Sequence, residues 1–301
     1  MRKVIVLLST YNGEKYIEEQ IKSILMQKGV QVEIVVRDDG STDKTIEILE
    51  FYKEKGLINW YAGENLKPAN SFMDLIYTAP VGDYYAFCDQ DDFWLEDKLE
   101  IAVRYLEMST EKKPALYYGR ARLVDKDLNL LKEGRTSSDV MLDLKSAIIN
   151  SNAIGCTMVF NKSLFDIVKE SQPSYISMHD AWVHKTCIIF HGNIFFDDDV
   201  HVLYRQHGNN VIGSTNSVWK KIVSHYKSFL KKECIRSRTI CSLIECYGEK
   251  MQVEDYEMCK LVADYKHSFK NRLKIVFQDK IKTNYLRRNT LFKIAILLKI
   301  F

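Results

Sequence analysis

The chain of 301 residues is 46% hydrophobic and 12% aromatic, which is enough apolar material for one large or two small packed domains. Its seven cysteines are odd in number and include no Cys-x-x-Cys pair, so they argue against a disulfide framework or a zinc knuckle and favour a cytoplasmic chain with reduced thiols. The apolar run at residues 4–8 is too short for the core of a signal peptide, and we expect it to form a buried first strand.

The net charge of +3 conceals an uneven distribution of charge along the chain. Residues 218–301 contain 19 Lys/Arg against 8 Asp/Glu, whereas residues 1–217 contain 24 against 32. A basic C-terminal part on an acidic body predicts a localised anionic partner, such as a membrane surface. We expect no nucleic-acid partner.

Short apolar runs alternate with helical patterns through the first half of the chain. We expect strands at residues 4–8, 33–37, 58–61 and 84–88. We expect helices after them, at residues 13–27, 43–55, 69–78 and 95–108. This alternation predicts βαβ units and therefore an α/β fold, with a mostly parallel sheet that is flanked by helices.

The second half of the chain is mixed and then helical. Strands are expected at residues 115–123, 157–160, 194–196 and 200–205, and helices at residues 144–149 and 179–190. The pattern after residue 215 is helical, with faces rich in Lys and Arg. We therefore expect one domain at residues 1–215 and a basic helical extension at residues 216–301.

Three polar segments follow the first, second and fourth expected strands, at residues 9–12, 38–43 and 89–92. Ligands bind outside the carboxyl ends of the strands in such sheets, so we expect these segments to gather at one edge. Asp89 and Asp91 point to the same side of an extended chain, and crowded carboxylates favour a hard divalent cation. The alternative for an acidic residue here is a helix N-terminus, which is the role we expect for Asp92.

Asp38 and Asp39 stand side by side at the end of the second expected strand. A carboxylate in this place can accept hydrogen bonds from a nucleobase imide or a ribose hydroxyl. Gly40, Ser41 and Asp43 have a simpler explanation, because they suit a tight turn and the cap of the next helix.

Two later segments carry further candidate side chains. Asp180 opens the expected helix at residues 179–190, where it is either an ordinary N-cap or a partly buried base with a raised pKa. Arg205 and His207 follow the last expected strand; an Arg can hold phosphate and a neutral His can ligate a metal, although a lone His is usually an ordinary polar residue. The chain contains no P-loop motif and no dinucleotide-binding glycine motif.

The chain resembles family 2 glycosyltransferases with the GT-A fold in three motifs that occur in the family's order, each at an expected strand end. The motifs are Ser9-Thr10-Tyr11-Asn12-Gly13, Arg37-Asp38-Asp39-Gly40-Ser41-Thr42-Asp43 and Asp89-Gln90-Asp91-Asp92-Phe93-Trp94. The resemblance covers roughly residues 1–110 and continues more weakly to about residue 213. It implies an inverting transfer of sugar from a nucleoside diphosphate donor, with a donor-binding half at residues 1–110 and an acceptor-side half at residues 111–215.

The resemblance also implies roles for the candidate residues. The donor-binding residues would be Thr10, Tyr11, Asn12 and Asp39 at the base and ribose, Asp89 near the ribose or sugar, and Arg205 at the diphosphate. Asp91, with His207 as a further contact, would hold Mg²⁺ or Mn²⁺, and Asp180 would be the general base. The ion would stabilise the charge on the leaving diphosphate, and inversion needs no protein nucleophile.

Within this family, the Asp-Gln-Asp-Asp-x-Trp and Tyr-Arg-Gln-His-Gly-x-Asn forms resemble bacterial rhamnosyltransferases, which build cell-wall or capsular polysaccharides from dTDP-L-rhamnose. The alternative within the family is a UDP-hexose or UDP-N-acetylhexosamine donor. Two alternatives come from other classes, a nucleotide-sugar-binding assembly subunit without catalysis and a nucleotidyltransferase. The lack of a Gly-rich, Lys-bearing loop after the first strand argues against the nucleotidyltransferase.

Residues 289–301 are apolar with interspersed Lys, and they are too few to span a bilayer, which needs about 20 residues. An interfacial helix is one interpretation, since each Lys or Arg near an anionic leaflet gains roughly 1 kcal/mol. We therefore expect a cytoplasmic protein that is peripheral on the inner face of the plasma membrane, close to a saccharide or lipid-linked acceptor. The alternative is a helix that packs on the body or in a homo-oligomer.

Overall fold

The computed structural model describes residues 1–135, 140–151, 153–206, 234–278 and 280–301. The chain divides into two compact units. The first contains Met1–Val140, Asn152–Ser171 and Met178–His207, and the second contains Met141–Ser151, Gln172–Ser177 and Gly208–Phe301. The expected boundary between residues 215 and 216 falls outside the described residues and stays a prediction.

The described part of the first unit is built on one sheet. Its strands are β1 (Lys3–Thr10), β2 (Gln31–Asp38), β3 (Asn59–Ala62), β4 (Tyr84–Asp89), β5 (Phe93–Trp94), β6 (Ala115–Val124), β7 (Leu130–Arg135), β8 (Val159–Asn161) and β9 (Asn193–Arg205). They lie in the order β3-β2-β1-β4-β8-β6-β9-β5, and β7 pairs with β6. The first four strands are parallel, as the βαβ pattern predicts. Beyond them β8 runs antiparallel to both β4 and β6, while β6 and β9 are parallel.

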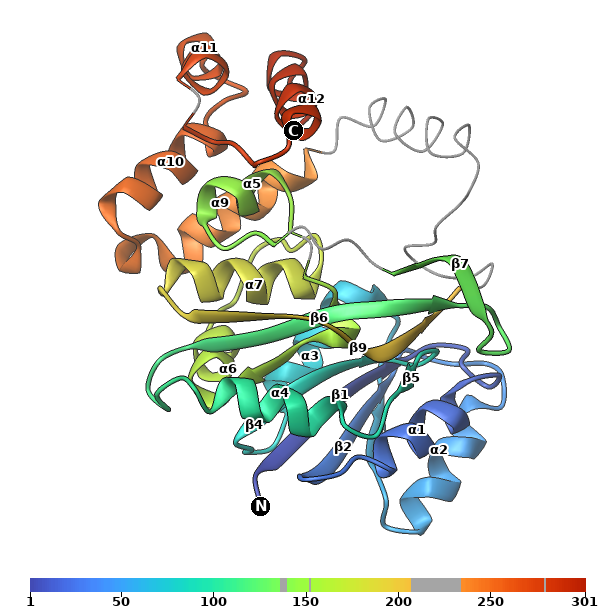
Figure 1. The fold of residues 1–301 in the computed structure, drawn as a ribbon. Helices are drawn as coiled ribbons and strands as arrows, with labels where there is room; N and C mark the ends of the chain where they lie inside the picture. The colour runs from blue at the N-terminus through green and yellow to red at the C-terminus, as the bar shows by residue number, and fades with distance from the viewer. Residues whose placement is uncertain (136–139, 152, 207–233, 279) are drawn as a thin grey trace. The chain divides into compact units, whose positions relative to one another are not determined.

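Helices cover both faces of this sheet (Figure 1). They are α1 (Ile17–Leu25), α2 (Thr45–Glu54), α3 (Lys67–Thr78), α4 (Lys98–Leu106), α6 (Lys162–Lys169) and α7 (His179–Ile189), with a 3-10 turn η1 (Gly155–Thr157). One face buries Val4, Val6 and Leu8 of β1 in a core with the apolar sides of α1, α2 and α4. The other face packs aromatic rings against α3 and α6, including Phe72 on Phe87 and Tyr85 on Phe165. The predicted α/β architecture is confirmed.

Two local expectations are wrong for identifiable physical reasons. Residues 194–196 and 200–205 form a single strand, β9, because its pairing with β6 shifts register after Asp197 and leaves Asp198 and Asp199 as a polar bulge. The expected start of a helix at Asp92 is also wrong. Phe93 and Trp94 pair with β9 as β5, so α4 begins only at Lys98 and Asp92 is buried ahead of β5.

The described part of the second unit is helical, as the pattern after residue 215 predicts. Its elements are α5 (Leu144–Ile149), α9 (Ile235–Tyr247), η2 (Gly248–Lys250), α10 (Val253–Ala263), α11 (Phe269–Phe277) and α12 (Leu286–Leu297). Phe301 is buried: its ring packs edge-on against Phe292 at 4.8 Å, and its backbone N–H donates to the Tyr265 hydroxyl at 3.0 Å. None of the described helices has the length and apolar character needed to cross a membrane.

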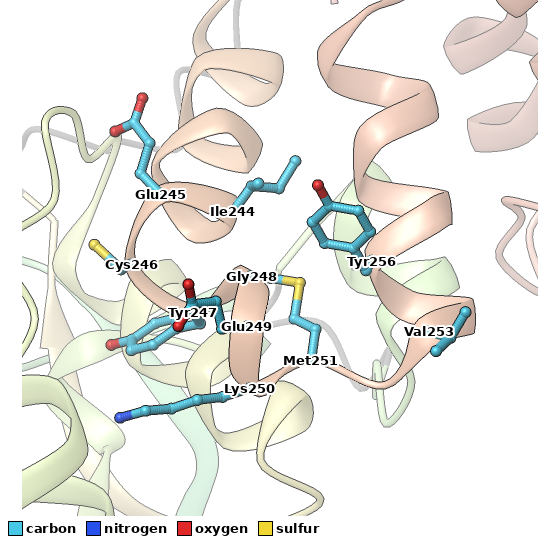
Figure 2. Close-up of a pocket in the computed structure, with 10 residues that line it drawn as sticks. All are labelled: Ile244, Glu245, Cys246, Tyr247, Gly248, Glu249, Lys250, Met251, Val253 and Tyr256. Atoms are coloured by element: carbon cyan, nitrogen blue, oxygen red, sulfur yellow. The ribbon is translucent and has the colours of Figure 1, made fainter.

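A cavity of about 670 Å³ lies where α9, η2 and α10 meet in this unit. Ile244 and Tyr256 line it from the two longer helices, with Met251 between them in sequence (Figure 2). None of the residues predicted to be catalytic or to bind donor or metal is among its lining residues. The predicted chemistry therefore has to be sought at the sheet edge of the first unit.

Candidate active site

The three sequence motifs meet at the carboxyl edge of the parallel strands. In the register of the sheet, Thr10 of β1 pairs with Asp38 of β2, and Ser9 pairs with Asp89 of β4. The polar segments that follow these strands are therefore neighbours, as the topology of a parallel sheet predicts.

Gln90 ties the first motif to the third. Its side-chain carbonyl accepts hydrogen bonds from the Thr10 hydroxyl at 2.6 Å and from the Tyr11 backbone N–H at 2.8 Å. Its amide N–H donates to the Tyr11 carbonyl at 3.1 Å. These three hydrogen bonds form a clamp on Thr10 and Tyr11. The clamp requires a glycine at position 13, because a Cβ on Gly13 would lie 2.4 Å from the Gln90 side-chain oxygen. Sequence reasoning missed this role, since a glutamine gives no sign of where its amide is bonded.

Asn12 ties the first motif to the second. Its backbone has a φ of 50°, a left-handed conformation that Asn tolerates better than most residues. Its N–H donates to the Ser41 hydroxyl at 2.8 Å, and its side-chain oxygen accepts the Thr42 N–H at 2.8 Å. The predicted contact of Asn12 with the donor stays a prediction. Tyr11, next to it, keeps 47% of its surface exposed.

Asp39 is buried at this edge and held by cationic and backbone groups. It forms an ion pair with Arg37, which also donates to Asp74 at 2.8 Å. The backbone N–H of Lys67 donates to Asp39 at 3.1 Å, and the Asp39 N–H itself donates to the carbonyl of Thr10 at 2.8 Å. The carboxylate is thus fixed between the end of β2 and the start of α3, within the same cluster as Thr10.

Asp180 joins the carboxylates of the third motif from a distant part of the chain. Burial, together with the charges of Asp91 and Asp180, raises the pKa of Asp89 to about 7. Burial likewise raises the pKa of Asp180 to about 6, although the backbone N–H groups of Ala181 and Gly155 oppose the shift. The charges of Asp91 and Asp180 both act on Asp89, so the three carboxylates share one electrostatic environment.

Asp92 lies directly behind this cluster and is fully buried. Burial and the charges of Asp91 and Asp89 raise its pKa well above the ordinary range, while hydrogen bonding to the Cys156 thiol and to the Arg205 backbone N–H opposes the rise. One ligand atom each from Asp89, Asp92 and Cys156 lie within 4.8 Å of one another. Cys156 belongs to η1 and was not among the predicted site residues.

These donor groups fit a hard divalent cation through their oxygens. Burial and neighbouring carboxylates raise the pKa values of Asp89 and Asp92, and a cation bound among their oxygens would offset both effects. Burial also raises the pKa of the Cys156 thiol, which keeps it protonated and makes it a hydrogen-bond donor rather than a metal ligand. Oxygen ligands are what Mg²⁺ and Mn²⁺ prefer.

Arg205 anchors the segment between β4 and β5, which carries Asp91 and Asp92. Its guanidinium donates to the backbone carbonyl of Asp91 at 2.9 Å, forms an ion pair with Glu19 and lies 4.6 Å from the centroid of the Tyr16 ring. Its own backbone N–H donates to Asp92 at 3.2 Å. The predicted contact of Arg205 with the donor stays a prediction, and His207 lies outside the described residues.

Comparison with known proteins decides the family. Residues 5–167, more than half of the chain, match the model of the family described as Glycosyl transferase family 2. The chain is a family 2 glycosyltransferase. It is 32% identical over 228 residues to the dTDP-rhamnosyl transferase RfbG of Shigella flexneri, with 70% of this chain and 75% of that protein covered. An uncharacterized glycosyltransferase of Rickettsia typhi, RT0329, is 26% identical, with coverages of 76% and 72%.

Solved structures confirm the predicted GT-A fold of this glycosyltransferase. The S. aureus TarS fragment 1–349 in complex with UDP-GlcNAc matches with a TM-score of 0.57 at 18% identity, covering 98% of this chain and 90% of that one. The mannosyltransferase PcManGT from Pyrobaculum calidifontis, in complex with GDP-Man and Mn²⁺, matches with a TM-score of 0.53 at 15% identity and coverages of 99% and 85%. The family assignment sets aside the assembly-subunit and nucleotidyltransferase alternatives.

Replacing Gln90 with Met should weaken nucleotide binding because it removes the clamp on Thr10 and Tyr11 while nearly keeping the side-chain volume. With each lost hydrogen bond costing a net 0.5–1.5 kcal/mol, we expect the dissociation constant of dTDP or UDP to rise by about tenfold or more. Titration calorimetry with Mg²⁺ present measures this change. Gln278→Met, at an exposed position after α11, is the control, and equal affinities of the two variants would contradict the role of Gln90.

Proposed function

We propose that this glycosyltransferase is an inverting, metal-dependent enzyme that moves L-rhamnose from dTDP-L-rhamnose to a saccharide or lipid-linked acceptor in cell-surface polysaccharide synthesis. The observation that carries the proposal is the meeting of Asp89, Asp91 and Asp180 at the edge where the donor-side motifs also end. Two of these carboxylates come from the metal-type motif and one opens a helix about 90 residues later. Such a cluster can serve a diphosphate-bound cation and a base at once.

The donor side of this proposal uses the groups that converge on Thr10. The exposed ring of Tyr11 is available to the base, and Asp39 lies close enough to Thr10 to share one nucleoside with it. We assign Thr10, Tyr11, Asn12 and Asp39 to the base and ribose, and Asp89 to the ribose or sugar. Arg205 is the remaining donor-side candidate, at the diphosphate.

A divalent cation, when bound, stabilises as a Lewis acid the charge that grows on the leaving diphosphate. Asp91 is the residue that we assign to hold it, with His207 as a further contact. Asp89 and Asp92 are neighbouring carboxylates with raised pKa values, and a bound cation would favour loss of their protons. Arg205 supports this role by fixing the Asp91 backbone. The Mn²⁺ in the PcManGT complex, a protein of the same fold, supports the choice of Mg²⁺ or Mn²⁺.

Asp180 is the residue that we assign as general base. As the acceptor oxygen bonds to the anomeric carbon, the bond to the diphosphate breaks and the hydroxyl proton passes to the Asp180 carboxylate. A carboxylate in a buried setting is a stronger base than an exposed one, and burial raises the pKa of Asp180 to about 6. The displacement inverts the anomeric carbon in one step, so no residue has to form a covalent sugar intermediate.

The choice of donor sugar rests on the relatives. The relation to RfbG, named a dTDP-rhamnosyl transferase, supports dTDP-L-rhamnose. The shared fold with TarS, solved with UDP-GlcNAc, keeps a UDP-hexose or UDP-N-acetylhexosamine as the second candidate.

A donor panel tests the function directly. Thermal unfolding and donor hydrolysis are measured with dTDP-L-rhamnose, UDP-glucose, UDP-galactose, UDP-GlcNAc and GDP-mannose, each with Mn²⁺ and with EDTA. We expect dTDP-L-rhamnose to stabilise the protein most, by about 2.7 kcal/mol at a hundredfold excess over its dissociation constant, and EDTA to reduce the effect. Asp91→Asn should lose the metal-dependent part, whereas Asp127→Asn at an exposed turn should keep it. Preference for a UDP-sugar would overturn the rhamnose assignment, and equal stabilisation in EDTA would overturn the metal assignment.

The pH dependence of transfer tests the role of Asp180. The ionised carboxylate is the active form, so kcat/KM should be flat above about pH 7 and fall roughly tenfold per pH unit below the pKa of about 6. Asp180→Asn should lower transfer by about 10²–10⁴-fold and leave nucleotide binding nearly unchanged. Asp264→Asn, an exposed carboxylate in the second unit, is the matched control. Full transfer activity in Asp180→Asn would show that Asp180 only serves the start of α7.

We also propose that the second unit binds the inner face of the plasma membrane through α11 and α12. After Asp264 the sequence contains ten Lys/Arg and one Asp, so this part of the chain carries a strong positive charge. Several large apolar side chains are nevertheless exposed on the two helices and at the residue that follows α12: Phe269, Phe277, Leu286, Leu291, Ile294, Leu297 and Leu298. Exposed apolar side chains among cationic ones are the composition of an interfacial surface on anionic lipid.

Vesicle binding tests this surface. The triple variant Leu291→Asn, Ile294→Asn, Leu298→Asn should lose binding to vesicles that contain phosphatidylglycerol, and wild-type binding should weaken in 1 M salt, where the Debye length falls to about 3 Å. Val253→Asn, at another exposed apolar position of the same unit, should bind like wild type. A wild-type protein that ignores vesicles but forms an oligomer that the triple variant cannot form would favour the homo-oligomer instead.

A further inference from the structure

We propose that Gly155 and His179 form a steric seat that positions the Asp180 carboxylate relative to Asp89. Both are positioning residues rather than catalytic ones. The inference rests on the proposed function of Asp180 as the general base, and it adds the reason why this carboxylate has a fixed place. Neither Gly155 nor His179 is among the residues that the sequence predicted for the site.

The His179 side chain is held in place by packing rather than by hydrogen bonds. It is buried, its ring stacks on Phe72 of α3 at 3.9 Å between centroids, and it meets Phe87 of β4 edge-on at 4.6 Å. Neither ring nitrogen has a hydrogen-bond partner among the described residues. Burial lowers the pKa of His179 to about 3, so the ring is neutral and packs as an aromatic group.

Gly155 provides the room that this ring requires. A Cβ on Gly155 would lie 2.7 Å from Nε2 of His179, closer than such atoms can approach, and 3.6 Å from Cβ of Asp180. The backbone N–H of Gly155 also hydrogen-bonds to the Asp180 carboxylate. One residue of η1 thus sets the position of the His179 ring and binds the adjacent carboxylate.

The seat connects the base to the donor side of the site. Phe87 lies two residues before Asp89 on β4, and His179 lies one residue before Asp180 on α7. The contact between the two rings therefore fixes the distance between the segments that carry the two carboxylates. The N-cap residue of α7, Met178, makes no side-chain capping hydrogen bond, and packing of the His179 ring helps to hold this turn in place.

A double-mutant cycle tests the seat. Gly155→Ala should push the His179 ring aside and lower kcat by between about tenfold and a hundredfold, because small misplacements of a catalytic group carry costs of that size. Binding of dTDP with Mn²⁺ should stay within twofold of wild type, since the donor-side residues are untouched. In the His179→Ala background there is no ring to displace, so Gly155→Ala should have a much smaller further effect on kcat.

Gly82→Ala is the matched control for a general loss of stability. A Cβ there would lie 2.5 Å from Cγ1 of Ile5 in the core, a clash of similar severity at the start of β4. It should lower the unfolding temperature without changing kcat of the folded protein. If His179→Ala does not fold, His179→Asn provides the smaller side chain for the same cycle.

The outcomes separate this inference from the proposed function. If Asp180→Asn is inactive but Gly155→Ala keeps wild-type kcat, the seat is wrong and the base assignment stands. If Asp180→Asn is fully active, the base assignment fails regardless of the cycle. Additive effects of Gly155→Ala and His179→Ala on kcat would also overturn the seat, because two residues that act through one contact must couple.

Discussion

Crowded carboxylates at one buried edge of the sheet are the constraint on which the rest of the site depends. Two unit charges 4 Å apart interact with about 4 kcal/mol at the effective dielectric of a protein surface, so several cannot ionise there together without cost. Asp89 shows this cost, since burial and the charges of Asp91 and Asp180 raise its pKa to about 7. The protein must therefore hold these carboxylates together through contacts of neighbouring residues. Their proximity favours the binding of a cation.

Two contacts that hold the third motif in place act through an amide side chain and a backbone carbonyl. Gln90, which is uncharged, joins the first and third motifs through its amide. Arg205 is charged, but it reaches Asp91 through the backbone carbonyl and gives its ion pair to Glu19. The scaffold therefore positions the carboxylate-bearing loop through an amide side chain and through backbone groups.

Sequence patterns predict where the strands end. They do not predict the long-range contacts that surround those strand ends. The period of the apolar residues placed Thr10, Asp39 and Asp89 at one edge, because parallel strands end together. The pairing of Phe93 and Trp94 with β9 is a long-range contact, and no local pattern distinguishes it from the start of a helix. The packing of His179 could not be predicted from the sequence either. It depends on aromatic rings of α3 and β4 and on a glycine in η1, which are far apart along the chain.

Lys98 is one of the buried cations near this edge. Its Nζ lies 3.1 Å from the centroid of the Trp94 ring and has no hydrogen-bond partner among the described residues. Burial lowers its pKa to about 7, against the opposing influence of Cys88, Cys156 and Asp92. A lysine with a lowered pKa is only partly protonated near neutral pH. It therefore neutralises the nearby carboxylates only weakly. The divalent cation that we propose at this edge would supply the positive charge that Lys98 provides only weakly.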